Sequence, residues 1–457
     1  NATMKQLKET TSALITVVFL FSGHYGVAFT PSFSHRIIPR LGNVARIARS
    51  EIRSDSLQEA ERVTFDDDGD NSSAANPASQ AGNKDELFSW TEQWYPILPE
   101  SYLQDQPIPL TLLEKDLVIW KTSSGEISVL EDSCPHRRAP LSTGKIVNGQ
   151  LACRYHGWRM NPTGICTEIP MDGSQKFSGK FCAKSYHAQV KGGLLWVFMS
   201  SDVVVPPPIP QGAADDTGTD DGWMIYTSPV SFLSQIENSF DPTHAPFTHE
   251  GSNSFGSEGF SPQNALAMER YELIEPSTIL GFALEHSPYQ KMPPGSPGIT
   301  TVRRFVAPCT TVVKSPFFST NLHFVPSKPG ETLIVINFGG GGSKTRKGVP
   351  KLVRKMTPKR LRIALKDFVH FAVQVSESRF RFVTQDQQTM QGQDYRKVND
   401  KTWSDMTPTA SDAGVKALQR WMGRFGDFGP FPIESSSAHQ RKDMSIWDSH
   451  GKFCPHC

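Results

Sequence analysis

The chain has almost no net charge and little cysteine, and each shortage excludes a class of protein. Lysine and arginine number 47 and aspartate and glutamate 46, so nothing in the overall charge favours binding to nucleic acid. Seven cysteines in 457 residues are too few, and odd in number, for the disulfide framework of a secreted scaffold. The hydrophobic content of 37% is enough for a sizeable core and excludes wholesale disorder.

The apolar run near the N-terminus is also short. Residues 13–21 are nine apolar or small residues, which suits a signal peptide and falls well short of the ~20 that span a membrane. Residues 30–50 then hold four arginines and no acid, a composition typical of a transit peptide. A signal segment followed by a transit segment resembles the presequences of algae with secondary plastids. We therefore expect residues 1–50 to be a plastid presequence, with an ordinary secretory signal as the alternative.

Composition also divides the rest of the chain. Residues 51–86 are polar, with a run of acids and little to bury, and we expect them to be a disordered spacer. A Pro-rich and then acidic segment at 203–222 is expected to be a linker. Folded domains are therefore predicted at 88–202 and 223–425, followed by a tail at 426–457.

Two Cys-His pairs are the strongest chemical signal. Cys134 and His136 form C-x-H, and 16 residues later Cys153 and His156 form C-x-x-H. The flanking segments 117–120, 127–130 and 193–198 have the composition of strands, which indicates two loops of a small β-domain. Two Cys on one iron and two His on the other are the ligands of a Rieske [2Fe–2S] cluster. A Cys2His2 zinc site is the alternative, although zinc fingers usually group Cys with Cys and His with His.

A second pair of histidines follows about 90 residues later. His244 and His249 are five residues apart, and Asp241 precedes them. Two His and one carboxylate form the triad of a non-heme Fe(II) oxygenase, which leaves coordination positions open for O2. Surface or core histidines are the alternative, but the upstream cluster needs an electron acceptor. Asp241 lies too near His244 to be the obvious third ligand, so we expect it to hydrogen-bond a ligand imidazole and relay electrons or protons.

The third ligand of this triad is expected from a later segment of helical composition. Residues 358–393 contain few helix breakers, and Asp386 stands there among amide side chains in T-Q-D-Q-Q. We predict Asp386 as the ligand, with Asp367, Glu377 and Asp394 as competitors.

Three motifs carry a resemblance to a known family. The segments C-P-H-R-x-A-P-L-S, C-x-Y-H-G-W and D-P-T-H-x-P-F-x-H resemble those of Rieske non-heme iron oxygenases of the pheophorbide a oxygenase group. That group includes chlorophyllide a oxygenase and the Rieske protein of the plastid inner-envelope translocon. The resemblance is dense over residues 90–260 and weaker towards the C-terminus.

This resemblance implies a role for each candidate residue. The [2Fe–2S] cluster would be bound by Cys134, His136, Cys153 and His156. A mononuclear non-heme Fe(II) would be bound by His244, His249 and Asp386. Asp241 would bridge to a Rieske histidine, usually across a subunit boundary in a homotrimer.

The resemblance also implies a fold and a function. The fold would be α+β, with an all-β Rieske domain followed by a catalytic domain of antiparallel sheet wrapped by helices, of the helix-grip type. The function would be a monooxygenase that oxygenates a chlorophyll-derived tetrapyrrole of the pheophorbide a or chlorophyllide a type in the plastid. Electrons would come from ferredoxin or a reductase, since the chain shows no G-x-G-x-x-G fingerprint. The alternatives are a Rieske electron-transfer or redox-sensing component of a plastid membrane assembly, and an oxygenase of another plastid substrate such as a carotenoid.

The other five cysteines are divided between the chain interior and its end. Cys166, Cys182 and Cys309 have no partner at ligand spacing and are expected to be plain thiols. Cys454 and Cys457 form a C-x-x-C similar to one in the same plastid group, and thioredoxin-linked dithiol exchange is one interpretation. An inert tail and a metal site are the others. A membrane anchor usually follows this motif in the group and is not present in this sequence, so association with the envelope or thylakoid membrane stays open.

Overall fold

The computed structural model describes ten stretches of the chain. These are residues 88–103, 106–122, 124–171, 181–214, 223–250, 260–291, 300–315, 319–337, 382–399 and 407–431. Every described residue belongs to one compact unit, residues 80–457. Several predictions concern residues outside these stretches: the presequence, the spacer, Asp367, Glu377, Cys454 and Cys457.

The first part of the described chain is built from short antiparallel strands. Among the described residues from 88 to 214 there is no α-helix. The strands are β1 (Trp94–Pro99), β2 (Ile108–Leu112), β3 (Lys115–Lys121), β4 (Ile127–Glu131), β5 (Lys145–Val147), β6 (Gln150–Ala152), β7 (Arg159–Met160), β8 (Cys166–Glu168), β9 (His187–Lys191) and β10 (Leu194–Phe198). They form three sheets in the orders β1-β10-β9, β2-β3-β4 and β5-β6-β7-β8.

Local sequence explains two of these strand pairings. The apolar run of β3 from Leu117 to Trp120 is fully buried, as expected for a strand covered on both faces. The turn between β5 and β6 is formed by Asn148 and Gly149, whose φ angles are 52° and 75°. A two-residue hairpin turn with positive φ at both positions matches the twist of the flanking strands and favours Asn-Gly.

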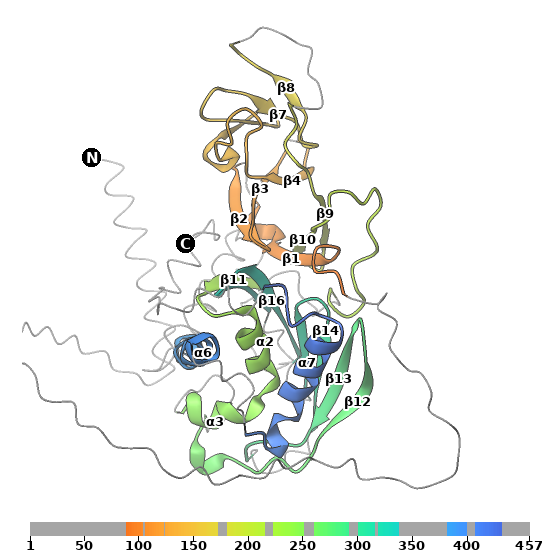
Figure 1. Cartoon of the computed structure of the whole chain (residues 1–457), viewed down its shortest axis with the longest axis vertical. Helices are drawn as coiled ribbons and strands as arrows, with labels where there is room; N and C mark the ends of the chain where they lie inside the picture. Colours follow the sequence, from red (N-terminus) through yellow and green to blue (C-terminus); the bar gives the residue numbers. More distant parts are fainter. Residues whose placement is uncertain are drawn as a thin grey trace, which may run out of the picture. The chain divides into compact units, whose positions relative to one another are not determined.

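The second part is one antiparallel sheet with helices packed on it (Figure 1). The strand order is β11-β17-β16-β15-β14-β13-β12. The strands are β11 (Trp223–Ser228), β12 (Tyr271–Thr278), β13 (Gly281–His286), β14 (Thr301–Val306), β15 (Thr310–Lys314), β16 (Ser319–Lys328) and β17 (Glu331–Asn337). The helices are α2 (Phe232–Phe240), α3 (Ala245–Thr248), α6 (Phe382–Asn399) and α7 (Ala413–Arg424). This architecture confirms the predicted α+β fold.

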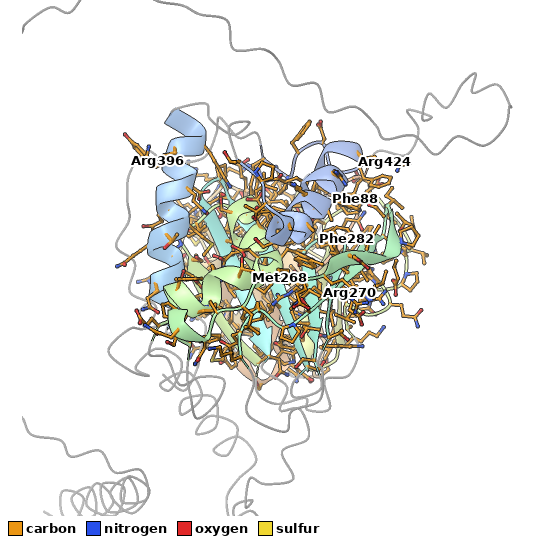
Figure 2. The ribbon with its side chains drawn as sticks, turned by 90° about the horizontal axis from the view of Figure 1, so that it is seen from below. Phe88, Met268, Arg270, Phe282, Arg396 and Arg424 are labelled. Carbon is orange, nitrogen blue, oxygen red and sulfur yellow. The ribbon has the colours of Figure 1, made fainter. Side chains whose placement is uncertain are left out.

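Helices α6 and α7 lie on either side of α2, where Arg396 and Arg424 mark them in Figure 2. Helix α7 packs through the buried side chains of Leu418, Trp421 and Met422. A capping box precedes it, because Thr409 and Asp412 each bond to the backbone of the other. Among the helices described, none is both long enough and apolar enough to cross a lipid bilayer.

One hydrophobic core contains residues from both sides of the predicted boundary between 88–202 and 223–425. Tyr95 and Trp196 from the first part and Ile225 and Phe305 from the second belong to the same buried cluster. The turn from β2 to β3 also bonds to β16, where the Leu113 backbone N–H donates to the Pro326 carbonyl at 2.9 Å. A smaller separate core lies beneath the Cys-His loops. The predicted domain boundaries stay a prediction.

Candidate redox and metal sites

The two Cys-His segments form loops with the same backbone hydrogen bonds. In the first, the Arg138 N–H donates to the Cys134 carbonyl at 2.8 Å and the Cys134 N–H to the Ala139 carbonyl at 2.9 Å. In the second, the Gly157 N–H donates to the Cys153 carbonyl at 2.9 Å and the Cys153 N–H to the Trp158 carbonyl at 2.8 Å. The residue four places after each Cys has positive φ, 59° at Arg138 and 74° at Gly157. Two sequences that share only part of a motif thus adopt one loop conformation.

These loops bring the four predicted cluster residues together. Cys134 and Cys153 are buried, and both are free thiols. His136 is exposed and His156 half-buried, and their ring centroids are 4.6 Å apart. The His136 ring also stacks on Trp158, with centroids 4.6 Å apart and planes 3° from parallel. The two thiols are buried and the two imidazoles are more exposed, an arrangement that fits a cluster with Cys ligands on one iron and His ligands on the other.

The second predicted site begins where α2 ends. The Asp241 carboxylate accepts hydrogen bonds from the Thr243 N–H at 3.0 Å and its hydroxyl at 2.7 Å. It thereby caps the 3-10 turn Pro242–His244. Helix α3 follows directly, and the His249 N–H donates to the Ala245 carbonyl at 3.1 Å. A single short helical segment therefore carries both histidines.

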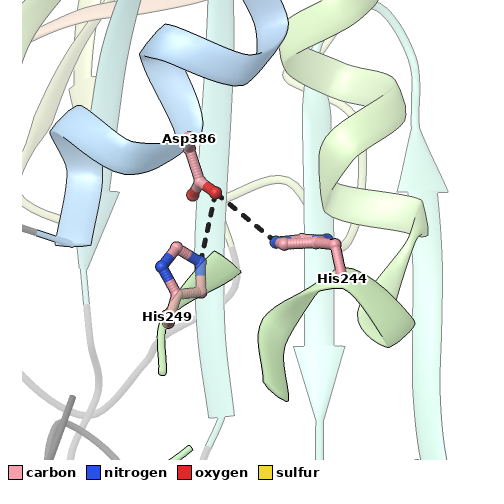
Figure 3. A group of neighbouring side chains, drawn as sticks. All are labelled: His244, His249 and Asp386. Atoms are coloured by element: carbon pink, nitrogen blue, oxygen red, sulfur yellow. Dashed lines mark ion pairs between the residues drawn. The ribbon is translucent and has the colours of Figure 1, made fainter. Parts of the chain in front are cut away.

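Asp386 of α6 completes this group, although it is far away in the sequence. Its Oδ1 lies 3.6 Å from His244 Nε2 and 3.1 Å from His249 Nε2 (Figure 3). The ligand atoms of the three residues all lie within 4.8 Å of one another. Of the competitors, Asp394 instead bonds to the start of α2.

The hydrogen bonds of the two imidazoles point their Nε2 atoms at Asp386. His244 Nδ1 lies 2.5 Å from the backbone oxygen of Asp241, and His249 Nδ1 lies 3.3 Å from Gln385 Oε1. Each Nδ1–H can therefore donate, as metal-binding imidazoles usually do through the nitrogen away from the metal. Asp386 Oδ1 is buried and has no hydrogen-bond partner among the described residues. Two neutral imidazoles and one carboxylate around a shared point fit a divalent iron.

Comparison with known proteins identifies the first of these regions. A family model described as the Rieske [2Fe-2S] domain matches residues 93–186. The chain therefore contains a Rieske domain. This matched range includes both Cys-His loops.

Two curated relatives extend the likeness beyond the Rieske domain. The chain is 27% identical over 467 residues to the chloroplastic pheophorbide a oxygenase of Oryza sativa subsp. japonica, covering 92% of this chain and 82% of the relative. It is 30% identical over 268 residues to the chloroplastic protein TIC 55 of Arabidopsis thaliana, covering 55% of this chain and 47% of that relative. The chain thus spans only about half the length of TIC 55. The predicted resemblance to the pheophorbide a oxygenase group is confirmed.

The fold also resembles those of solved structures. Dicamba monooxygenase bound to dicamba superposes with a TM-score of 0.53 over 73% of this chain and 96% of that one. The two are 17% identical, so the likeness concerns the fold. It extends well beyond the Rieske domain.

The side chains of the Rieske loops have shifted pKa values. Burial, together with the hydrogen bond to Cys153 and its charge, raises the pKa of Cys134 to about 11. Desolvation and the neighbouring charges of His156 and Arg137 lower the pKa of His136. Because iron binds thiolate, cluster assembly has to displace a tightly held proton from Cys134.

At the triad, neighbouring charges shift the pKa values in the direction opposite to that of burial. Burial lowers the pKa of His244, but its hydrogen bond to Asp241 and the charges of Asp386 and Asp241 outweigh this and raise the pKa. Burial likewise raises the pKa of Asp241, but His244 and Thr243 more than offset it, so the pKa is lowered. The Asp241 carboxylate Oδ2 lies 3.7 Å from His244 Nδ1, beyond hydrogen-bond distance. Its backbone oxygen makes the bond to the ring.

The three other described cysteines are separate from both sites. Cys166 is buried, with its Sγ 3.6 Å from the Glu168 carbonyl, and Cys182 is exposed. Burial raises the pKa of Cys166 and of the fully buried Cys309. All three are free thiols. The raised pKa values make Cys166 and Cys309 poor nucleophiles.

Two functional neighbours were not predicted from the sequence. Gln385 accepts from His249, and its position beside Asp386 was the available signal. Trp158 stacks on His136, and it belongs to the C-x-Y-H-G-W motif. In both cases the residue was part of a recognised segment, but its contact depends on the fold.

Proposed function

We propose that this chain is a Rieske-type monooxygenase that oxygenates a chlorophyll-derived tetrapyrrole in the plastid. The observation that carries this function is the meeting of His244, His249 and Asp386 in a chain with a Rieske domain. A carrier of electrons alone needs only the cluster, whereas an oxygenase needs a second metal where O2 can bind. A relative aligned over 92% of this chain is named pheophorbide a oxygenase, which supports the substrate class.

The proposal assigns each residue a task. The cluster would be held by Cys134, His136, Cys153 and His156, and a mononuclear Fe(II) by His244, His249 and Asp386. When bound, that Fe(II) supplies coordination positions for O2. The backbone oxygen of Asp241 keeps the proton on Nδ1 of His244, and its carboxylate is partly exposed, at 31%. That exposed carboxylate would meet a Rieske histidine of a neighbouring subunit in a homotrimer.

One apolar ring beside His249 is the candidate contact for a flat substrate. Phe260 is buried, and its ring centroid lies 5.9 Å from that of His249. Phe232 and Phe240 are buried in the main core instead, and Phe247 is exposed. The sequence from 232 to 318 is rich in phenylalanine. Three more of these residues lie outside the described stretches, namely Phe255, Phe317 and Phe318. Phe260 is therefore the described ring placed to contact a tetrapyrrole.

Iron content and isotope transfer test the function together. The purified protein, reconstituted anaerobically, should hold three irons per chain. Reduced with ferredoxin and its reductase under 18O2, it should place one 18O atom in pheophorbide a or chlorophyllide a. Two irons per chain and no product would favour an electron-transfer component. Label in a carotenoid alone would keep the oxygenase and replace the substrate.

We further propose that the chain works in the plastid, because relatives carry chloroplastic names and residues 1–50 have presequence composition. A fusion of residues 1–50 to a fluorescent protein should enter plastids of an alga with secondary plastids, whereas secretion of the fusion would support the ordinary signal peptide. Ferredoxin or a reductase as donor, and thioredoxin acting on Cys454 and Cys457, stay predictions of the same scheme.

A further inference from the structure

Helix α6 holds Asp386, yet its described side chains contribute little apolar burial. Of residues 385–397, whose side chains are described, the buried ones are Gln387, Met390 and Asp394. Two of these three are polar, in contrast to the buried Leu418, Trp421 and Met422 of α7. Since apolar burial is what usually docks a helix, residues 385–397 of α6 have to be held mainly by other contacts.

Asp394 makes the most concentrated of those contacts. Its carboxylate accepts from the Ser231 N–H at 2.7 Å, from the Ser231 hydroxyl at 2.7 Å, and from the Ser234 hydroxyl. Ser231 is the N-cap of α2, so the carboxylate faces the helix end where unpaired N–H groups and the positive dipole favour an anion. Asp394 is 4% exposed, and little water competes for these bonds.

Further polar contacts extend this attachment along α6. Gln387 Nε2 lies 3.3 Å from the Ser228 hydroxyl, and Gln391 donates to the Pro229 carbonyl at 3.1 Å. One turn beyond Asp394, Lys397 donates to the Ser234 hydroxyl at 2.8 Å and to Glu237 at 2.9 Å. Successive turns of α6 are thus bonded to successive positions between Ser228 and Glu237.

We call these hydrogen bonds between α6 and residues 228–237 the α6–α2 seam. The seam joins the two elements that carry the triad. Its α2 side leads directly into Asp241 and His244, and its α6 side leads back to Asp386, eight residues or roughly 12 Å of helix from Asp394. A rotation or slide of α6 by part of a turn would move the Asp386 carboxylate away from both imidazoles. Hydrogen bonds resist such a displacement more strongly than apolar contacts do, because they weaken steeply with distance and angle.

We propose that Asp394 is a positioning residue for the triad, which sets the register of α6 so that Asp386 meets His244 and His249. The inference rests on the proposed iron site and names a residue on which its affinity depends. Asp394 touches neither the metal nor the substrate and acts through Asp386.

Iron affinity of the holoprotein tests this role. A chelator that spares the Rieske cluster removes the mononuclear metal, and Fe(II) is titrated back anaerobically and read by the EPR signal of its nitric oxide adduct. Asp394→Ala should weaken Fe(II) binding by up to about tenfold, the lower end of the loss caused by changing a group bonded directly to a metal ligand. The Rieske EPR signal should not change. Asp394→Asn should recover much of the affinity, because its amide oxygen still accepts from the Ser231 N–H.

Asp412→Ala is the matched control, since the Asp412 carboxylate also bonds at the start of a helical segment, the 3-10 turn Ala410–Asp412, which carries no triad residue. It should lower the melting temperature without changing Fe(II) affinity. Wild-type affinity in Asp394→Ala, or an equal loss in Asp412→Ala, would overturn the inference. If Asp394→Ala does not fold, Ser234→Ala removes one bond to the carboxylate and should weaken Fe(II) binding by less, while unchanged binding would count against the role. A wild-type protein that takes up no third iron would refute the proposed function itself, and this inference with it.

Discussion

The Rieske loops and the triad use similar side chains but are assembled in different ways. All four cluster residues lie between positions 134 and 156, on two loops with identical backbone hydrogen bonds. The triad draws two residues from one short helical segment and the third from α6, more than 130 positions later. The loops hold their ligands through local backbone geometry, whereas the triad depends on how α6 is docked. A substitution distant from the metal should therefore weaken metal binding at the triad more than cluster binding at the Rieske loops.

The two sites also hold protons for opposite reasons in the metal-free chain. The Cys134 thiol keeps its proton because burial disfavours the thiolate. The pKa of His244 is raised because Asp241 and Asp386 favour the imidazolium cation, despite burial. Metal binding displaces a proton in each case, but burial favours the proton on Cys134 and opposes it on His244.

The largest expected effect is a complete loss of one site with retention of the other. Cys134→Ser should remove the [2Fe–2S] cluster, because a hydroxyl is a poor ligand for this iron and the loop has no second thiol. Rieske absorbance and EPR should vanish and turnover should stop, while the nitric oxide adduct of Fe(II) at the triad should still form. An unchanged Rieske spectrum in this variant would show that Cys134 is not a ligand.

The reciprocal loss is expected from His244→Ala. Iron content should fall from three to two per chain, and turnover should cease, because one imidazole and one carboxylate hold Fe(II) weakly. The Rieske EPR signal should persist, since no contact of His244 among the described residues reaches the cluster loops. Full activity in this variant would exclude His244 from the catalytic site.

The same contrast explains how much the sequence alone revealed. The strands around the loops were predicted at 117–120 and 127–130 and confirmed as β3 and β4, since apolar strands and Cys-His motifs are local patterns. The two histidines of the triad were equally visible. Asp386 was one of four acids under consideration, and its meeting with the imidazoles depends on contacts between α6 and α2. Asp394 stood among the competitors because composition does not distinguish a metal ligand from the anchor of its helix.

The pH dependence of metal uptake gives a smaller, graded comparison. Because the pKa of His244 is raised in the folded protein, its protonated form stabilises the metal-free fold fully below the ordinary value of about 6.5. That stabilisation is lost as the pH rises through the folded pKa. Fe(II) needs the neutral ring, so its affinity should fall on acidification, beginning above about pH 6.5, by up to roughly tenfold per pH unit.

Asp241→Asn sharpens this test, since it removes the carboxylate charge and keeps the backbone oxygen that accepts from His244. Its midpoint for Fe(II) uptake should shift to lower pH, whereas Asp412→Asn should not shift it. Calorimetric or EPR titrations of Fe(II) uptake, at intervals of about half a pH unit between pH 5.5 and 8, show the direction in which the midpoint shifts. An unchanged midpoint would mean that Asp241 does not set the protonation of His244.

The smallest expected effect is a difference in stability between variants of the two Rieske loops. Gly157 has φ of 74°, and a Cβ there would lie 3.2 Å from Pro170 Cγ. Arg138 occupies the matching place with φ of 59° and already bears the cost of a side chain in this conformation. Gly157→Ala should therefore destabilise its loop by about 1–2 kcal/mol, while Arg138→Gly should be near neutral, because relief of strain offsets the entropy cost of glycine.

Thermal bleaching of the Rieske absorbance measures this difference, since both variants keep all four ligands. Gly157→Ala should bleach at a lower temperature than wild type, and Arg138→Gly within about a degree of it, because the exposed contact of Arg138 with Ser133 at 3.3 Å contributes little. Equal losses in the two variants would show that the loops are not equivalent in strain, despite their shared hydrogen bonds. If both variants bleach at the wild-type temperature, the four bonds from the protein to iron hold the loops regardless of backbone preference.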